Sequence, residues 1–175
     1  MNKYKHLILV GDSMIEFFNW QERLPALKVD NLGRAGESVE ELGHRAKRIV
    51  QQFEPPDLVL VMIGTNNVAM ENFSFIPAYE EILTTFAGVW PDAKLVVNSL
   101  LPMELGYLAP DTVSRVNQSL KDLAGQCGAS YLDVWSAMDG KNGHALDGVL
   151  EDEVHLSHTG YGIWAEVLDD FLRRG

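Results

Sequence analysis

The chain has 175 residues, and 14 Lys and Arg against 25 Asp and Glu give a formal net charge of −11. This length supports a full hydrophobic core, so we expect residues 1–175 to form a single domain. Cys127 is the only cysteine, which excludes an intramolecular disulfide. The pI near 4.8 argues against nucleic acid as a partner. The longest apolar run, Leu58 to Ile63, is far shorter than the roughly 20 residues that span a bilayer, so no stable membrane insertion is expected.

The N-terminal residues lead directly into an apolar strand, without the separate hydrophobic region and cleavage site of a signal peptide. Together with the lone thiol, this favours a cytoplasmic location. Five short apolar runs alternate with longer amphipathic stretches, which is the pattern of an α/β protein. The predicted strands are His6 to Val10, Lys28 to Leu32, Leu58 to Ile63, Lys94 to Asn98 and Ser130 to Leu132.

Helices are predicted between these strands. Ser38 and Glu41 form a capping box, and the apolar residues after them recur at helical spacing as far as Phe53. Three more helices are expected from about Phe75 to Val89, Thr112 to Ala124 and Thr159 to Leu172. The predicted buried face of the helix from Thr112 carries Val113, Val116, Leu120 and Leu123. That of the helix from Thr159 carries Ile163, Val167, Leu168 and Phe171.

We therefore expect a three-layer α/β/α fold with a flavodoxin-like five-stranded parallel sheet in the order 2-1-3-4-5. In such sheets, sites form beyond the carboxyl ends of the strands, near the point where strand order reverses. The first three strands are neighbours in this order, so the segments that follow them meet on one rim. These segments are Gly11-Asp12-Ser13-Met14, Gly33 to Ser38, and Gly64-Thr65-Asn66-Asn67.

Ser13 and the pair Asp152 and His155 are the candidates for nucleophilic catalysis. Ser13 follows a buried strand, where its hydroxyl lies beside a helix N-terminus. An Asp three residues before a His can hold the imidazole Nδ1 and leave Nε2 free as a base, which a serine nucleophile needs. Taken alone, the Ser13 segment can also be a simple turn. Asp152 and His155, taken alone, can also be a surface ion pair.

An acyl-transfer site also needs donors for the tetrahedral oxyanion. Asn66 can supply a side-chain amide, Gly36 a backbone N–H that allows close approach, and Ser13 its own backbone N–H. Each glycine and asparagine also fits a turn, and for Gly33 a turn is the preferred interpretation.

These segments resemble the SGNH hydrolase superfamily, the GDSL esterases and lipases. Its blocks occur in order as Gly11-Asp12-Ser13, Gly36, Gly64-Thr65-Asn66-Asn67, and Asp152-Glu153-Val154-His155, so the likeness covers nearly the whole chain. Within this superfamily, the chain is similar to the catalytic subunits of intracellular platelet-activating factor acetylhydrolase in four segments. They are Gly-Asp-Ser-Met, Gly-Thr-Asn-Asn, Leu-Leu-Pro and His-Leu-Ser-His-Thr-Gly-Tyr.

The resemblance implies that Ser13 is the nucleophile, His155 the general base and acid, and Asp152 its orienting partner. It places Gly36, Asn66 and the Ser13 N–H in the oxyanion hole. Two positions depart from the usual blocks, because Asn67 and Glu37 stand where many relatives carry Asp. Neither is assigned to chemistry, so the departures bear on loop shape and substrate choice.

The expected activity is hydrolysis of carboxylic esters, such as short-chain acyl, lysophospholipid or aryl esters, through an acyl-serine intermediate. A carbohydrate O-acetyl esterase and a catalytically silent binding module are the alternatives. A metal cluster of Asp152, His155 and His158 lacks a further ligand, and a flavin site lacks phosphate-binding hydroxyls, so no metal or cofactor is expected. The expected partner is a small ester, and the sequence leaves room for a homodimer that pairs through exposed helices.

Apolar residues for a substrate pocket follow the first, third and fourth strands. About half of them are expected to belong to the core instead. They are Met14, Ile15, Phe17, Phe18, Trp20, Val68, Met70, Leu101, Met103, Leu105 and Tyr107.

Overall fold

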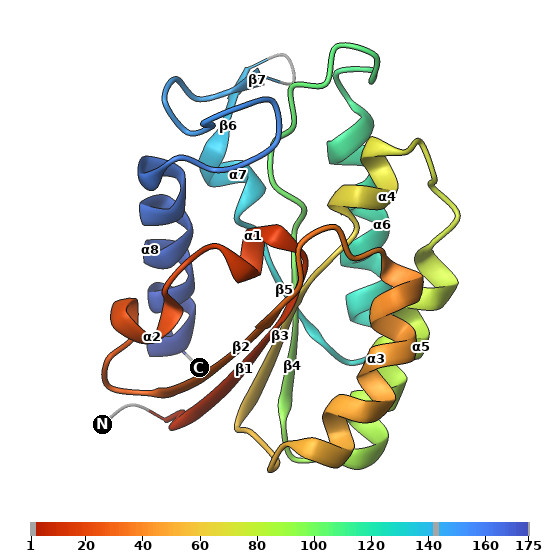
Figure 1. The fold of residues 1–175 in the computed structure, drawn as a ribbon, viewed down its shortest axis with the longest axis vertical. Coiled ribbons are helices and arrows are strands. Elements are labelled where there is room, and N and C mark those ends of the chain that lie inside the picture. The colour runs from red at the N-terminus through yellow and green to blue at the C-terminus, as the bar shows by residue number, and fades with distance from the viewer. Residues whose placement is uncertain (1–2, 142–143, 175) are drawn as a thin grey trace.

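The computed structural model, which describes residues 3–141 and 144–174, contains the predicted parallel sheet (Figure 1). Its strand order is β2-β1-β3-β4-β5, and every neighbouring pair is parallel, which confirms the predicted topology. The predicted strand bounds are correct to within one residue. The strands are β1 (His6–Gly11), β2 (Lys28–Gly33), β3 (Leu58–Met62), β4 (Lys94–Asn98) and β5 (Ser130–Leu132).

Helices cover both faces of this sheet (Figure 1). One face carries α3 (Val39–Gln52), α5 (Ile76–Val89) and α6 (Thr112–Gln126). The other carries α8 (His158–Arg174), with the short helices α1 (Ser13–Glu16), α2 (Trp20–Arg23) and α7 (Trp135–Met138) beside it. None of the helices in the described ranges combines the length and the apolar character needed to cross a membrane.

Several short elements were not predicted. They are α1, α2, α7, the helix α4 (Thr65–Ala69), and the hairpin of β6 (Asp139–Lys141) and β7 (His144–Ala145). A helix of four or five residues is barely longer than one turn, so it leaves no hydrophobic periodicity in the sequence. Two of these helices lie directly after β1 and β3 and carry Ser13 and Asn66.

The buried faces of two helices differ from the prediction. In α8, the fully buried large side chain is Trp164, and Ile163 and Val167 are only half-buried, because the face that meets the core carries Tyr161, Trp164 and Leu168. In α6, Asn117 is buried while Val116 is half-buried. The Asn117 amide is satisfied, since it accepts from the Leu100 N–H at 2.7 Å and donates to the Leu100 carbonyl at 3.0 Å. Phe171, predicted to be buried, is also half-buried.

Candidate active site

Ser13 begins α1, just after β1, which lies between β2 and β3 in the sheet. Asp12 caps this helix, because its Oδ1 accepts from the Met14 N–H at 3.0 Å. Gly11 permits the turn to lie against β3, since a Cβ at this position would be 2.0 Å from the Met62 carbonyl oxygen. Strand and cap together place the Ser13 side chain at the rim of the sheet, where 7% of the residue is exposed.

Asp152 and His155 lie in the segment before α8. The Asp152 Oδ1 accepts from the backbone N–H of His155 at 2.6 Å and of Val154 at 2.7 Å, while Oδ2 is 2.8 Å from the imidazole Nδ1. These hydrogen bonds lower the pKa of Asp152 to about 2, and the bond from the His155 backbone N–H contributes most to this shift. Asp152 therefore carries its charge throughout the neutral range and fixes both the backbone and the ring of His155.

The fold brings Ser13 and His155 together across 142 positions of sequence. Ser13 Oγ lies 3.3 Å from His155 Nε2, so the three side chains form a continuous chain from hydroxyl to imidazole to carboxylate. The hydroxyl-to-imidazole distance is slightly long for a hydrogen bond, as is common in sites without substrate. The Phe17 ring lies 5.8 Å from the imidazole, centroid to centroid, and covers part of it.

Gly36, in the turn after β2, and Asn66, in α4 after β3, lie in two segments that contact each other. Gly36 has a φ of +77°, and the Glu37 N–H donates to the Arg34 carbonyl at 3.2 Å, which are features of a type II turn. The Asn66 amide Nδ2 donates to the Glu37 carbonyl at 2.9 Å. The turn is also held close to Ser13, because the Arg34 N–H donates to the Gly11 carbonyl at 2.8 Å.

The contacts from Ser13 to His155 and from His155 to Asp152 give the hydroxyl an oriented base, which a serine nucleophile needs. The comparison of the whole chain identifies its family. The family model of GDSL-like lipases and acylhydrolases matches residues 9–163. The chain belongs to this GDSL-like Lipase/Acylhydrolase family. As a GDSL-like acylhydrolase, it is a carboxylic ester hydrolase.

Individual relatives of this acylhydrolase agree with the family. Platelet-activating factor acetylhydrolase IB subunit alpha1 from Rattus norvegicus is 25% identical over 182 residues, covering 99% of this chain and 77% of the rat protein. A GDSL-like lipase from Bacteroides thetaiotaomicron has the same fold, with a TM-score of 0.77 at 19% identity and coverage of 99% and 90%. An acetyl xylan esterase from Geobacillus stearothermophilus gives a TM-score of 0.75 at 20% identity, with coverage of 96% and 94%.

A buried ion pair that the sequence did not indicate holds the turn that carries Gly36. The Glu37 carboxylate accepts from Arg45 Nε at 2.6 Å and from Arg45 Nη2, and Nη2 also donates to the Leu32 carbonyl at 2.9 Å. Both side chains are at most about one tenth exposed. In the sequence, the pair is visible only as Glu37 in the second block and Arg45 in the first half of the following helix. This spacing does not by itself indicate an ion pair.

Asn67, the second departure from the usual blocks, has a structural role. It is fully buried, its Oδ1 accepts from the Val39 N–H at 2.9 Å, and its Nδ2 donates to Glu40 at 2.8 Å. An amide supplies both an acceptor and a donor here, whereas a carboxylate would face Glu40 with like charge. The neutral side chain of Asn67 therefore makes both of these hydrogen bonds without bringing a second negative charge beside Glu40.

The remaining histidines, Cys127 and the apolar rim residues take no part in the contacts from Ser13 through His155 to Asp152. His158 begins α8, and His6 is held by Asp30, with Nε2 to Oδ2 at 2.6 Å. Cys127, the only cysteine, is half-buried against the core just after the end of α6. The apolar rim residues divide as expected: Phe17, Met70 and Tyr107 are exposed. The buried ones are Met14, Ile15, Trp20, Val68, Leu101 and Met103.

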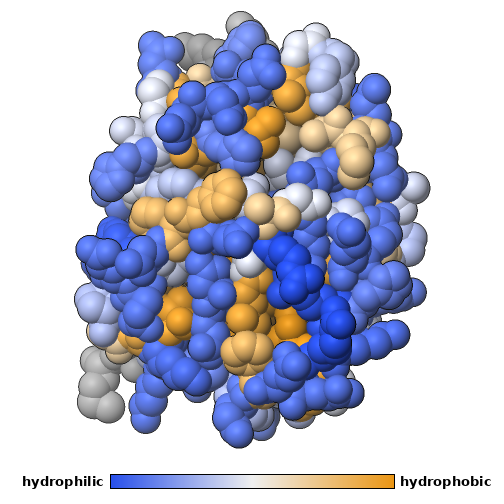
Figure 2. Space-filling view, in the orientation of Figure 1, coloured by the Kyte–Doolittle hydropathy of each residue, from blue (hydrophilic) through white to orange (hydrophobic). Residues whose placement is uncertain are grey.

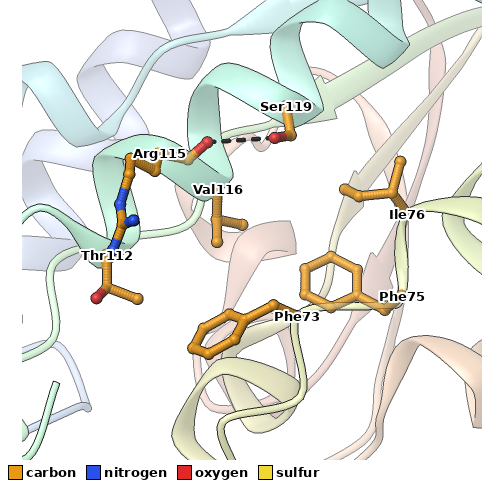
Figure 3. Close-up of a pocket in the computed structure, with 7 residues that line it drawn as sticks. All are labelled: Phe73, Phe75, Ile76, Thr112, Arg115, Val116 and Ser119. Atoms are coloured by element: carbon orange, nitrogen blue, oxygen red, sulfur yellow. Dashed lines mark hydrogen bonds between the residues drawn. The ribbon is translucent and has the colours of Figure 1, made fainter. Parts of the chain in front are cut away.

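A separate apolar pocket of about 390 Å³ lies between α6 and the segment before α5 (Figure 3). Phe73, Phe75 and Val116 point into it, and none of the predicted site residues lines it. The pocket is nevertheless next to the third block, because a Cβ at Gly64 would lie 3.2 Å from the Phe75 ring. The Phe75 ring, which lines the pocket, thus packs against Gly64, the residue that precedes α4.

Proposed function

We propose that this acylhydrolase cleaves its ester through an acyl-serine intermediate, with Ser13 as nucleophile, His155 as general base and acid, and Asp152 as the orienting partner. The single observation that carries the proposal is the sequence of contacts from Ser13 Oγ to His155 Nε2 at 3.3 Å and from His155 Nδ1 to Asp152 Oδ2 at 2.8 Å. A serine hydroxyl is a weak nucleophile and needs such an oriented base.

In the proposed reaction, His155 Nε2 removes the Ser13 proton while Oγ bonds to the acyl carbon. The tetrahedral intermediate collapses when His155 returns this proton to the leaving alcohol and the ester C–O bond breaks. Water then repeats both steps on the acyl-serine and releases the carboxylic acid. Because Asp152 is ionised across the neutral range, it stabilises the imidazolium that forms in each step.

We assign the oxyanion to the Ser13 N–H, the Gly36 N–H and the Asn66 amide. The contact between Asn66 and the Glu37 carbonyl supports this assignment, because it places the amide beside the turn that carries Gly36. Donors of this kind act mainly in the transition state, and removing one costs about 10²–10³ in kcat.

We propose short-chain acyl, aryl or lysophospholipid esters as substrates. The exposed side chains of Phe17, Met70 and Tyr107 support an apolar acyl group, and the rat relative is named for an acetylhydrolase of platelet-activating factor. The alternative, a carbohydrate O-acetyl esterase, is favoured by the fold shared with an acetyl xylan esterase. We place the activity in the cytoplasm because the single cysteine needs no oxidising compartment, and we keep the homodimer as a proposal.

Hydrolysis of p-nitrophenyl acetate, butyrate, octanoate and palmitate by wild type, Ser13→Ala and Asn66→Ala tests the proposal. Wild type is expected to turn over, Ser13→Ala to fall to background, and Asn66→Ala to lose about 10²–10³ in kcat. A sharp preference for acetate together with activity on acetylated xylan would favour the carbohydrate esterase. If none of the proteins turned over any ester, the silent binding module would take its place.

A further inference from the structure

Two polar atoms next to the proposed active site are buried without a hydrogen-bond partner. They are Asp12 Oδ2 and Thr65 Oγ1, and this holds within the residues that the structure describes. Hydrophilic side chains cover most of the surface in Figure 2, whereas Asp12 is fully buried and Thr65 is 4% exposed. Leaving a buried polar atom unpaired costs free energy, so two such atoms beside a reactive serine call for a physical reason.

The two residues follow neighbouring strands of the sheet. β1 and β3 are parallel, with Gly11 opposite Met62, so α1 and α4 begin at the same edge (Figure 1). Asp12 caps α1 through Oδ1. The N-cap of α4 is Gly64, which has no side chain that could accept from the first N–H groups of the helix. The cap that α1 receives is therefore missing from the start of α4.

Other polar groups near the Asp12 carboxyl are already engaged. Tyr79, Tyr161 and His155 interact with it electrostatically. The two tyrosine hydroxyls donate to backbone carbonyls at 3.0 Å and 3.1 Å, and the imidazole contacts the proposed nucleophile and its own carboxylate partner. None of these three groups is left to bind Oδ2.

Thr65 differs from them, because its hydroxyl is unused. Burial raises the pKa of Asp12 to about 6, and the hydroxyl and backbone N–H of Thr65 are among the groups that oppose this rise. Both groups of Thr65 therefore act on the carboxyl. A hydroxyl can donate or accept, so it can bind Oδ2 whether Asp12 is ionised or protonated. Hydrogen bonds in active sites are often loose before substrate binds and tighten in the complex.

We propose that Asp12 and Thr65 form a positioning pair, in which Oδ2 and Oγ1 bind each other and hold the start of α4 against α1. Ser13 follows Asp12 and Asn66 follows Thr65, so the pair sets the distance between the Ser13 N–H and the Asn66 amide. The inference rests on the proposed oxyanion hole and adds two residues that touch no substrate atom. Oxyanion donors act mainly in the transition state, so loss of the pair lowers kcat and changes KM little.

Substitutions of Thr65 test the hydroxyl separately from the shape of the side chain. On p-nitrophenyl butyrate, Thr65→Val keeps the branched shape and should lower kcat about tenfold, with little change in KM. Thr65→Ser keeps the hydroxyl and should restore most of the rate. Thr112→Val is the matched control, because Thr112 is also buried, at 5% exposure, but begins α6 outside the proposed site, and its kcat should equal that of wild type. A Thr65→Val protein as fast as wild type, or a Thr65→Ser protein as slow as Thr65→Val, would overturn the pair.

Double substitutions test whether the pair acts as a unit and through Asn66. Asp12→Ser keeps an oxygen that can cap α1 but lacks the second oxygen, so Asp12→Ser/Thr65→Val should be no slower than the slower single variant. Asn66→Ala/Thr65→Val should be no slower than Asn66→Ala, because an absent amide cannot be misplaced. Losses in kcat that multiply in either combination would overturn the inference.

Urea unfolding separates failure of the pair from failure of the hydrolase proposal, because it does not depend on activity. The losses of unfolding free energy in Asp12→Ser and Thr65→Val should add to more than the loss in the double variant, whereas those in Asp12→Ser and Thr112→Val should be additive. This result supports the pair even if wild type turns over no ester, an outcome that would count against the hydrolase proposal alone. Additive losses in both combinations would overturn the pair.

Discussion

Asp12, the residue before the nucleophile, is a fully buried carboxyl group. Its Oδ1 caps α1, whereas its Oδ2 has no hydrogen-bond partner within the described residues. Burial, partly offset by hydrogen bonds, raises the pKa of Asp12 from 3.8 to about 6. The cap is thus a group that favours its protonated form in the folded protein.

Asp12→Asn should therefore change how stability depends on pH. Between pH 3.8 and about 6, the native state holds a proton that the unfolded chain releases, so rising pH lowers the free energy of unfolding. The full penalty, present above pH 6, corresponds to at most about 3 kcal/mol. Asn resembles the neutral carboxyl and keeps the Oδ1 acceptor, so its stability relative to wild type should increase from pH 4 to pH 8.

Urea unfolding of wild type and Asp12→Asn at both pH values measures this difference. The same difference in unfolding free energy at pH 4 and pH 8 would show that Asp12 does not titrate as described. Loss of activity in the variant is a separate matter, since the cap lies next to Ser13.

At the scale of elements, the buried pair of Glu37 and Arg45 ties the turn after β2 to α3. Asn66 on α4 donates to the Glu37 carbonyl, so the pair supports both the Gly36 turn and α4, the two segments assigned to the oxyanion. Arg45 also binds the Leu32 carbonyl at the end of β2. The pair is best described as a positioning device, because it acts through the turn.

Arg45→Ala is expected to destabilise the protein by about 3–5 kcal/mol, because it leaves Glu37 buried and unpaired. Glu37→Leu/Arg45→Met should recover part of this loss, since apolar residues of similar volume replace a buried pair at little cost. Urea unfolding checks both values. Arg115→Ala, which breaks the exposed pair with Asp111, is the control and should cost less than about 1 kcal/mol. Equal costs for Arg45→Ala and Arg115→Ala would contradict the conclusion that the Glu37–Arg45 pair is buried and holds the turn to α3.

The sequence predicted the elements that carry a long pattern. Buried runs such as Leu58 to Ile63 indicate strands by themselves, and the capping box of Ser38 and Glu41 is present in the structure. Asp152 and His155 were predicted to interact because their spacing lets the carboxylate reach the ring. Short helices and pairs such as Glu37 with Arg45 were missed, because they depend on how separate loops pack rather than on any local period.

At the scale of the whole molecule, an aromatic cluster joins the first segment of the chain to the last helix. The Phe18 and Tyr161 rings stack at 4.6 Å between centroids, and Trp20 meets Trp164 edge-on at 4.9 Å. The Tyr161 hydroxyl donates to the Met14 carbonyl at 3.1 Å, across 147 positions of sequence. Since one core cluster runs from Tyr4 to Leu172, we propose that the chain acts as one domain.

Tyr161→Phe should lower both stability and kcat. The substitution removes the hydrogen bond to Met14, the residue after Ser13, and leaves a carbonyl unpaired, at a cost of about 1–3 kcal/mol. We expect kcat on p-nitrophenyl butyrate to fall severalfold with little change in KM. Tyr4→Phe is the matched control, because the Tyr4 hydroxyl has no partner in the described residues. Equal effects of the two substitutions would contradict a specific role for the Tyr161 hydroxyl.

Intact-mass measurement after treatment with a fluorophosphonate tests the role of Ser13 most directly. The reagent labels only a serine that an oriented base activates, so wild type should gain the mass of one adduct. Ser13→Ala, with the same circular dichroism spectrum as wild type, should gain none. An unlabelled wild type, or a Ser13→Ala protein that is labelled equally, would contradict the assignment of Ser13 as the nucleophile.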